Sequence, residues 1–307
     1  MGGCGGGGAG RVTLLLDFTP NANHAGIFSA VARRYDRREG VRLDVRAPAD
    51  SAEALKLLAA GRADLAVLDI HDLALAREHG ADVVGVAALV QRPLASVIAA
   101  RGVRSPRALE GRRVGVTGVP SDDAVLRSTV QGVGGDPARV RTVTIGFNAV
   151  SSLLAGRVAA ATAFWNIEGV ALARRGRGFH PFKVDGYGAP GYPELVVSVT
   201  RATLEHKGDE IRRVLRALAR GYVFAGENST SSALDIVRAQ PGLDRQLVES
   251  ELRTTAPIFL PASRRWGELD PATLRAWAAW EARFGIVRRP PDVARAFDGR
   301  LVPRAPS

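Results

Sequence analysis

The sequence predicts an α/β protein built as two lobes, and three observations support this prediction. Apolar runs typical of strands alternate with helical stretches along most of the 307 residues. Two such series of comparable size follow one another, with crossings expected near residues 91–100 and 190–200. From about residue 203 onward the pattern is helical only. Two lobes joined by two crossings form a hinge, and we expect the ligand site in the cleft between them.

The first series alternates strands and helices at the spacing of βαβ units. Strands are expected at 12–18, 43–47, 64–68 and 83–90, and helices at 24–38, 51–60 and 71–78. This alternation favours a largely parallel sheet with right-handed crossovers.

The second series repeats this alternation, and helices complete the chain. Strands are expected at 96–100, 113–116, 141–145, 159–164, 179–184 and 195–200, and helices at 121–133, 150–155, 167–175, 207–227, 231–240, 244–255 and 271–284. The second crossing returns the chain to the first lobe. We therefore expect a tether at 1–10, a first lobe made of 11–95 and 196–307, and a second lobe at 96–195.

Charge and composition exclude several classes of protein. The formal net charge is +11, but the basic residues are scattered arginines, with lysine only at 56, 183 and 207, so we expect no nucleic-acid partner. No run approaches the roughly 18 apolar residues of a membrane span. With Cys4 as the single cysteine, neither an intrachain disulfide nor a thiolate zinc site can form.

The first ten residues, Met-Gly-Gly-Cys-Gly-Gly-Gly-Gly-Ala-Gly, resemble the stub of a bacterial lipoprotein signal with Cys4 as the lipidated residue. The charged and apolar parts of a signal peptide are missing from this stretch. Either the start lies too far downstream and the protein is extracytoplasmic, held at the membrane by a lipid on Cys4, or the protein is cytoplasmic with a glycine-rich end.

Polar side chains gather directly after the first predicted strand, where α/β proteins collect ligand-binding groups. Asp17, Asn21, Asn23 and His24 lie within one turn, and together they offer a carboxylate, two amides and an imidazole to a polar heterocycle. The asparagines equally suit the turn and the cap of the following helix.

A histidine between two aspartates follows the third predicted strand. Asp69, His71 and Asp72 have a spacing that suits a metal ion or a proton-transfer pair. Asp69 equally suits the N-cap of the helix that carries His71. One imidazole among carboxylates is weak support for a metal, so we expect none.

Two strand ends of the second series also present polar groups. Glycines before Ser121 and Asp122 leave backbone N–H groups that suit an anion, although the lysine of a phosphate loop is missing. Trp165, Asn166 and Glu168 follow another strand, where the indole would stack on an aromatic ligand and the carboxylate would pair with an amino-pyrimidine edge. A core tryptophan beside a helix-capping asparagine is the alternative.

Further candidates lie near the second crossing, where Tyr187, Tyr192 and Glu194 would close the site. No nucleophile elbow and no glycosidase-like pair of carboxylates is recognisable. The visible chemistry is recognition, so we expect a binding protein without a cofactor, not an enzyme.

Several motifs, taken in order, resemble the NMT1/THI5-like family from about residue 12 to 300. They are Leu16-Asp17-Phe18-Thr19-Pro20-Asn21 with His24-Ala25-Gly26, Ala60-Gly61-Arg62-Ala63-Asp64, Gly118-Val119-Pro120-Ser121-Asp122, Gly146-Phe147-Asn148 and Trp165-Asn166-Ile167-Glu168-Gly169. The resemblance implies a type II periplasmic-binding-protein fold. Bacterial members are mostly substrate-binding proteins of ABC importers, including the ThiY type that binds a formylaminopyrimidine.

Carried over to this sequence, the resemblance implies a cleft lined from both lobes and the hinge. The residues implied are Asp17, Phe18, Asn21, His24, His71, Ser121, Asp122, Trp165, Asn166, Glu168, Tyr187 and Glu194. Phe18 stands where the family usually has tryptophan. The implied partners are a small pyrimidine and the permease and ATPase of an importer, and we expect the receptor itself to be a monomer.

The same family contains eukaryotic enzymes that make the thiamine pyrimidine from pyridoxal phosphate and a histidine. His71 lies in the segment where those enzymes carry that histidine. Val67 stands where a Schiff-base lysine would be needed, and the segment from Tyr192 to Val197 replaces their cysteine-rich motif. We therefore favour an importer receptor for thiamine salvage over a pyrimidine synthase. Relatives of the fold that bind sulfonates or nitrate are a further alternative.

Overall fold

The computed structural model describes residues 10–49, 53–176 and 178–304. The predictions for Cys4 and for most of the tether at 1–10 lie outside these residues. Among the described residues, no helix is both long and apolar enough to cross a membrane.

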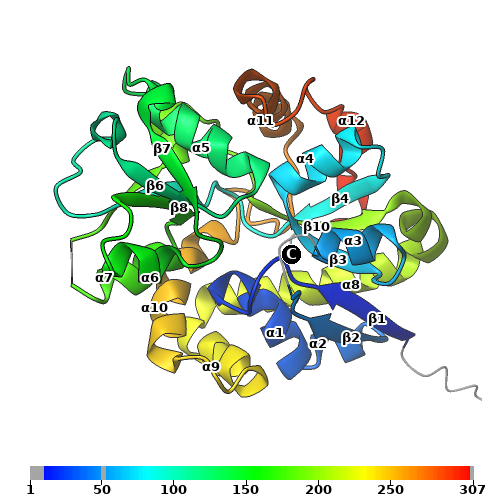
Figure 1. The fold of residues 1–307 in the computed structure, drawn as a ribbon. Helices are drawn as coiled ribbons and strands as arrows, with labels where there is room; N and C mark the ends of the chain where they lie inside the picture. The colour runs from blue at the N-terminus through cyan, green and yellow to red at the C-terminus, as the bar shows by residue number, and fades with distance from the viewer. Residues whose placement is uncertain (1–9, 50–52, 177, 305–307) are drawn as a thin grey trace, which may run out of the picture.

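Two five-stranded sheets form the centres of two lobes (Figure 1). Lobe 1 contains β1 (Gly10–Leu15), β2 (Val41–Arg46), β3 (Leu65–Asp69), β4 (Val83–Ala88) and β10 (Leu195–Thr200), in the order β2-β1-β3-β10-β4. Lobe 2 contains β5 (Ala95–Ala99), β6 (Arg113–Val116), β7 (Arg141–Thr144), β8 (Ala160–Phe164) and β9 (His180–Lys183), in the order β7-β6-β8-β5-β9.

The sheets are largely parallel, as expected, but each contains one strand that runs against the other four. In lobe 1, β1 pairs in parallel with β2 and β3, but β10 is antiparallel to β3 and β4. In lobe 2, β6 pairs in parallel with β7 and β8, but β5 is antiparallel to β8 and β9. The antiparallel strand in each sheet directly follows a crossing between lobes. Its direction is therefore set by the return of the chain, which a local βαβ pattern does not reveal.

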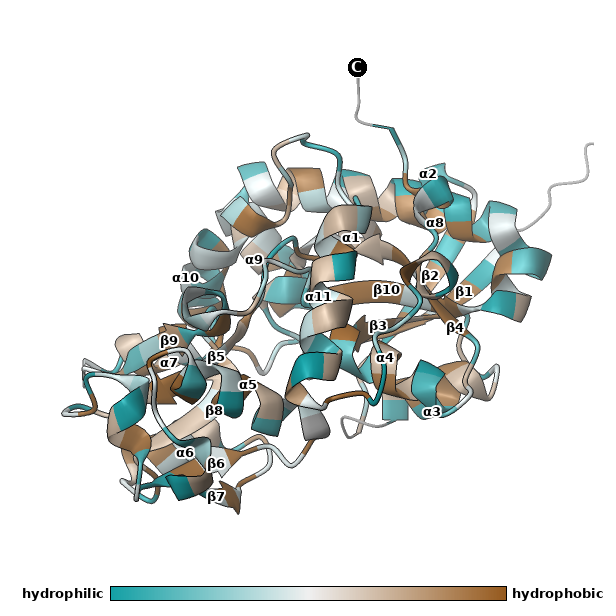
Figure 2. Ribbon diagram, turned by 90° about the horizontal axis from the view of Figure 1, so that it is seen from above, coloured by the Kyte–Doolittle hydropathy of each residue, from teal (hydrophilic) through white to brown (hydrophobic). Residues whose placement is uncertain are grey.

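Helices cover both sheets, and β3, β4 and β10 at the centre of lobe 1 are strongly hydrophobic in Figure 2. Lobe 1 carries α1 (Ala25–Ala32), α2 (Tyr35–Arg38), α3 (Glu53–Ala59), α4 (Ile70–Glu78), α8 (Arg201–Glu227), α9 (Ser229–Ala239) and α12 (Val293–Ala296), and lobe 2 carries α5 (Pro120–Gln131), α6 (Ala149–Leu154) and α7 (Glu168–Ala173). Short 3₁₀ helices are η1 (Ala22–His24), η2 (Pro106–Leu109), η3 (Pro137–Arg139), η4 (Val184–Tyr187), η5 (Ala256–Ile258) and η6 (Gly299–Leu301). The expected single helix at 24–38 is broken, because Arg34 is left-handed with φ 59°.

Two further helices connect the lobes. α11 (Pro271–Phe284) packs against α5, and α10 (Arg245–Thr255) packs against both η1 and α7. The chain itself crosses between β4 and β5 and again between η4 and β10, and the crossings are tied by a bond from Leu89 N to Leu195 O of 2.8 Å. The C-terminal helices therefore contact lobe 2 as well as lobe 1, which the sequence did not indicate.

A close approach of α1 and α8 positions the loop after β1. A Cβ added to Gly221 would lie 2.0 Å from the carbonyl oxygen of Gly26, so only glycine fits at this crossing. The next residue, Tyr222, is fully buried and donates its hydroxyl to Asn23 O at 2.8 Å. Helix packing thus fixes the backbone of η1, which follows directly on the polar loop of the candidate site.

Candidate functional site

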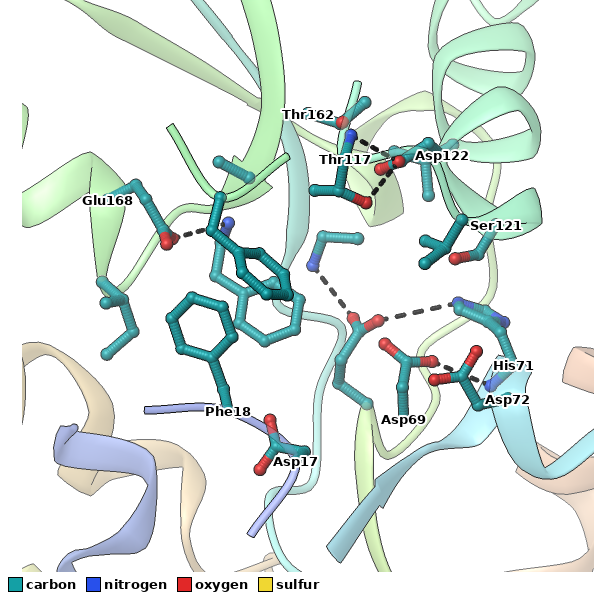
Figure 3. Close-up of a pocket in the computed structure, with 18 of the residues that line it drawn as sticks. Asp17, Phe18, Asp69, His71, Asp72, Thr117, Ser121, Asp122, Thr162 and Glu168 are labelled. Carbon is teal, nitrogen blue, oxygen red and sulfur yellow. Dashed lines mark hydrogen bonds and ion pairs between the residues drawn. The ribbon is translucent and has the colours of Figure 1, made fainter. Parts of the chain in front are cut away.

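A cavity of about 140 Å³ lies between the two sheets, and the ends of strands from both lobes line it (Figure 3). From lobe 1 it receives the loop after β1 and the junction of β3 and α4, and from lobe 2 it receives the segments after β6, β7 and β8. Six of the residues predicted from the sequence to bind ligand and two further aspartates bring side chains to this cavity: Asp17, Phe18, Asn21, Ser121, Asp122, Glu168, Asp69 and Asp72. His71 and Glu194 also border it. The site therefore lies at strand ends and between lobes, as expected for α/β proteins.

The loop after β1 is held by hydrogen bonds among three predicted residues. Asn21 caps η1 by accepting the backbone N–H of Asn23 at 2.8 Å, and its own backbone N–H donates to His24 Nδ1 at 3.2 Å. The ring hydrogen of His24 therefore lies on Nε2, which donates to Asp17 Oδ1 at 2.8 Å. His24 is fully buried and does not line the cavity. It orients the Asp17 carboxylate and does not itself face the ligand space.

Carboxyl groups dominate the polar surface of the cavity. Asp17, Asp69, Asp72, Asp122, Glu168 and Glu194 all line it, and its described lining contains neither lysine nor arginine. Burial raises the pKa of Asp69 well above its usual value and that of Asp72 to about 6, while the charge of His71 acts in the opposite direction. Burial also raises the pKa of Glu168. Such a surface attracts cations and hydrogen-bond donors.

His71 carries the positive charge of this region. It is buried at the start of α4, its Nδ1 pairs with Glu281, and its Nε2 lies 3.6 Å from Glu194 Oε1. Burial by itself would lower the pKa of His71, but the neighbouring carboxylates, above all Glu281, raise it to about 10. His71 is therefore an imidazolium at neutral pH.

Asp69, His71 and Glu194 have ligand atoms within 4.8 Å of one another, which is the spacing of a metal site. Asp69 also caps α4, because its Oδ1 accepts His71 N at 2.8 Å. A metal ion needs a neutral imidazole. The raised pKa of His71 and its pairing with Glu281 work against that state, so this cluster fits a cation less well than its spacing indicates.

A carboxylate of the protein itself, that of Asp122, occupies the backbone donors at the start of α5. Asp122 Oδ2 accepts the backbone N–H groups of Thr117 at 2.7 Å and Gly118 at 3.0 Å, and the Thr117 hydroxyl at 2.6 Å. These are the backbone donors that the sequence offered to a bound phosphate or carboxylate. Because the Asp122 carboxylate occupies them, the expected anion site is not available to a ligand.

Aromatic rings supply the apolar wall of the cavity. Phe18 of lobe 1 and Phe147 of lobe 2 meet edge to face with ring centroids 4.5 Å apart, and Phe164 also lines the cavity. Phe147 is 50% exposed, so the pair lies where the cavity approaches solvent. A flat ligand would find ring faces here.

Besides His24, three predicted site residues do not line the cavity. Trp165 donates its indole N–H to Pro93 O at 3.0 Å, and Lys183 Nζ covers its ring at 3.6 Å, so the expected stacking on Trp165 is wrong. Asn166 is fully buried and bridges the lobes by donating to Asn23 at 2.6 Å and to Thr255 at 2.9 Å. The third of these residues is Tyr187.

Tyr187 is partly buried and packs edge to face on Phe182, with the ring centroids 5.8 Å apart. Burial raises the pKa of its phenol. The ring is part of the packing of lobe 2 and does not close the cavity. Tyr192, by contrast, is fully buried behind the cavity beside His71.

Other lining residues carry a weaker sequence signal, and the prediction of site residues omitted them. Phe147, Phe164, Thr117 and Thr162 lie in or directly after strands of lobe 2. Their position at a strand end could have identified them. Whether the side chain of such a residue faces the cavity depends on the strand's orientation, which the sequence does not fix.

The fold and the cleft define the class. Two mixed α/β sheets, two crossings and a cavity between the lobes constitute a type II periplasmic-binding-protein fold, as predicted. The structure is similar to the alkanesulfonate-binding protein from Xanthomonas axonopodis pv. citri bound to MOPS, with a TM-score of 0.74 and 17% identity over 94% of this chain and 98% of that one.

The chain belongs to the NMT1/THI5-like family, which it matches over residues 21–231. It is 33% identical to the formylaminopyrimidine-binding protein of Halalkalibacterium halodurans, over 81% of this chain and 76% of that protein. It is also 23% identical to the 4-amino-5-hydroxymethyl-2-methylpyrimidine phosphate synthase of Legionella pneumophila, over 96% of this chain and 93% of that protein.

Proposed function

We propose that this protein is the substrate-binding component of an ABC importer and captures a thiamine-related pyrimidine of the formylaminopyrimidine or hydroxymethylpyrimidine type. The observation that carries the proposal is the lining of the cavity, where six carboxyl groups and three phenylalanine rings meet without a lysine or an arginine among the described residues. An aminopyrimidine has N–H donors for the carboxylates and a flat ring for the aromatic wall. The name of the 33% identical relative supports the same ligand class.

The charge of the cavity argues against the anionic ligands that the fold also accommodates. A sulfonate, nitrate or phosphate group needs cationic or backbone donors. Here the backbone donors at the start of α5 are occupied by Asp122, and the single imidazolium, His71, is already surrounded by carboxylates. An anion entering this cavity would meet repulsion, whereas an amino group would meet acceptors.

The lining of the cavity also argues against a pyrimidine synthase. Imine formation with pyridoxal phosphate needs a lysine, and Val67, which lines the cavity, is apolar and fully buried. The phosphate of that cofactor would also need positive charge, and the one cation of the described lining, His71, is already paired with Glu281 and Glu194. We therefore infer a binding protein whose residues orient a ligand and exclude water without breaking a bond.

Ligand capture in this proposal proceeds by closure of the lobes. The contact of Phe18 with Phe147 in the cavity wall and the hydrogen bond from Asn166 to Asn23 join the lobes. The pyrimidine would lie between them and add its own contacts to both lobes. Delivery to a permease and ATPase, a monomeric receptor, an extracytoplasmic location and a lipid on Cys4 complete the proposal.

Thermal unfolding with a panel of ligands tests the proposal. A ligand at 100 times its Kd adds about 2.7 kcal/mol, which shifts Tm by several degrees. We expect formylaminopyrimidine or hydroxymethylpyrimidine to raise Tm, and taurine, nitrate, hydroxymethylpyrimidine phosphate and pyridoxal phosphate to leave it unchanged. Stabilisation by the anions alone would refute a pyrimidine receptor, and stabilisation by pyridoxal phosphate would favour the enzyme.

A further inference from the structure

A buried charged cluster lies behind the wall of the cavity. Glu281 of α11 is 0% exposed and pairs through Oε1 with Nδ1 of His71, which lies 210 residues earlier in the chain. Glu281 does not line the cavity and belongs to the helix that packs against α5 of the other lobe. Trp277 and Trp280, both buried, complete the surroundings of the imidazole. A charged pair in such an apolar setting needs an explanation, because burial of charge is costly.

The other side of the His71 ring faces the hinge. His71 Nε2 lies 3.2 Å from the hydroxyl oxygen of Tyr192 and 3.6 Å from Glu194 Oε1. The imidazole is thus flanked by one carboxylate outside the cavity and one at its border. An imidazolium in this position is attracted to both of them, whereas a neutral ring would leave both carboxylates buried without a counter-charge.

The two oxygens of Glu194 have different surroundings. Oε2 accepts the backbone N–H groups of Leu94 at 2.6 Å and Ala95 at 2.9 Å, which lie at the first crossing, while Glu194 itself lies at the second. Oε1 is buried and has no hydrogen-bond partner among the described residues, although the side chain lines the cavity. An acceptor of this kind, fixed at one oxygen and unpartnered at the other, is suited to a ligand's N–H donor.

We propose that Glu281 is a positioning residue for ligand recognition: it holds His71 as the imidazolium, and the imidazolium keeps Glu194 ionised so that Oε1 accepts a hydrogen bond from the ligand. The inference rests on the proposed function for the nature of the ligand, but the charge state of His71 does not depend on it. A residue of α11, outside the cavity, thereby sets the electrostatics of the binding surface.

The remaining titratable groups around His71 favour its positive charge as well. Asp69 at the end of β3 and Asp72 on α4 lie on the cavity side, and Tyr192 lies at the second crossing. The negative charges of both aspartates stabilise the positive charge of His71. The same charges oppose the ionisation of Glu194. Burial raises the pKa of Glu194, and the charge of His71 lowers it. If His71 became neutral, Glu194 would take up a proton at a higher pH.

The first test is a measurement on the unmodified protein without ligand. NMR of the imidazole carbons and nitrogens of His71 should show the doubly protonated ring up to at least pH 9. Titration of the ring near its usual pKa of 6.5 would overturn the inference. This result does not depend on which ligand the protein binds, so it separates the inference from the proposed function.

The second test compares Glu281→Gln with a matched control, Glu205→Gln, which removes the same charge from an exposed position on α8. The Kd of formylaminopyrimidine is measured by calorimetry from pH 5 to 9, and the ratio of variant to native Kd is taken at each pH, so that titration of the ligand itself cancels. We expect a ratio above tenfold at pH 6 that falls toward unity at pH 9, where Glu194 is ionised in both proteins. The control ratio should stay near unity throughout.

A ratio for Glu281→Gln that is the same at every pH would indicate ordinary structural damage and would overturn the inference, and so would an unchanged affinity. Should Glu281→Gln fail to fold, the His71 titration in the native protein decides the question. Absence of pyrimidine binding by the native protein would refute the proposed function alone, because the charge of His71 is measured without ligand.

Discussion

Substitution of Glu194 by glutamine tests the site most directly, because glutamine keeps one of the two contacts and reverses the other. The glutamine Oε1 can replace Glu194 Oε2 as acceptor for the N–H groups of Leu94 and Ala95, so the hinge contact is retained. The amide Nε2 then takes the position of Oε1, the unpartnered oxygen of a side chain that lines the cavity. A ligand amino group would meet a donor where it had met an acceptor.

The expected magnitude follows from this geometry. A hydrogen bond to a charged acceptor contributes about 1.5–3 kcal/mol, which corresponds to roughly a 10- to 150-fold increase in Kd when it is lost. The free energy of unfolding should change by less than about 1 kcal/mol, because the backbone donors keep an acceptor and a buried charge is removed. This variant should therefore bind the ligand more weakly while its stability stays nearly unchanged.

Isothermal titration calorimetry with formylaminopyrimidine at pH 7 gives the affinity, and thermal unfolding without ligand gives the stability. Glu205→Gln serves as the control for loss of one negative charge. A Kd for Glu194→Gln within threefold of the native value would refute the role of Oε1 as a ligand acceptor. A large fall in Tm together with weaker binding would instead assign Glu194 to the hinge.

Three further predictions concern contacts between the lobes. Phe147→Ala removes the contact with Phe18, worth about 0.5–1.5 kcal/mol, and should speed ligand dissociation in stopped-flow experiments roughly two- to tenfold with little change in Tm; an unchanged rate would contradict the contact. Asn166→Ala leaves its two buried partners short of a donor and should lower the free energy of unfolding in urea by about 1–3 kcal/mol; a loss near zero would show that the bridge is not formed. Burial, with repulsion from Glu168 added to it, raises the pKa of Glu251 from 4.5 to about 8. The folded state keeps this proton to a higher pH than the unfolded chain does. The free energy of unfolding should therefore fall as the pH rises from about 4.5 to 8. Glu251→Gln should lack that part of the fall in denaturation curves measured across the range, and parallel curves would contradict the assignment.

Strand ends could be predicted from the sequence, whereas the direction of individual side chains could not. Trp165 and Phe164 illustrate the difference. Phe164 is the last residue of β8 and lines the cavity, whereas the next residue bonds to Pro93 and lies under Lys183. Successive side chains near a strand end point to opposite faces, so a shift of one residue exchanges a ligand platform for a structural contact. The sequence marks both aromatics equally.

Long-range charge pairs could not be predicted from the sequence, for a different reason. Glu281 lies in an ordinary amphipathic helix, and nothing local distinguishes it from a solvent-exposed glutamate. Its role emerges only when the fold brings α11 against α4 and places the carboxylate on His71. The local cap of α4 by Asp69, in contrast, is visible in the sequence and is confirmed, because it involves residues two positions apart.

The contacts between lobes affect how ligand affinity arises. Asn166 and the pair of Phe18 and Phe147 join the lobes by contacts within the protein, so part of the free energy of closure comes from the protein itself. A ligand then needs to supply only the remainder, and its apparent Kd is the intrinsic value divided by the fraction of protein that is closed. Residues that never touch the pyrimidine can thus weaken its binding by lowering that fraction. Glu194 differs from them, since it lies at the second crossing, bonds through Oε2 to the first, and also lines the cavity, which places it to link ligand recognition to the hinge.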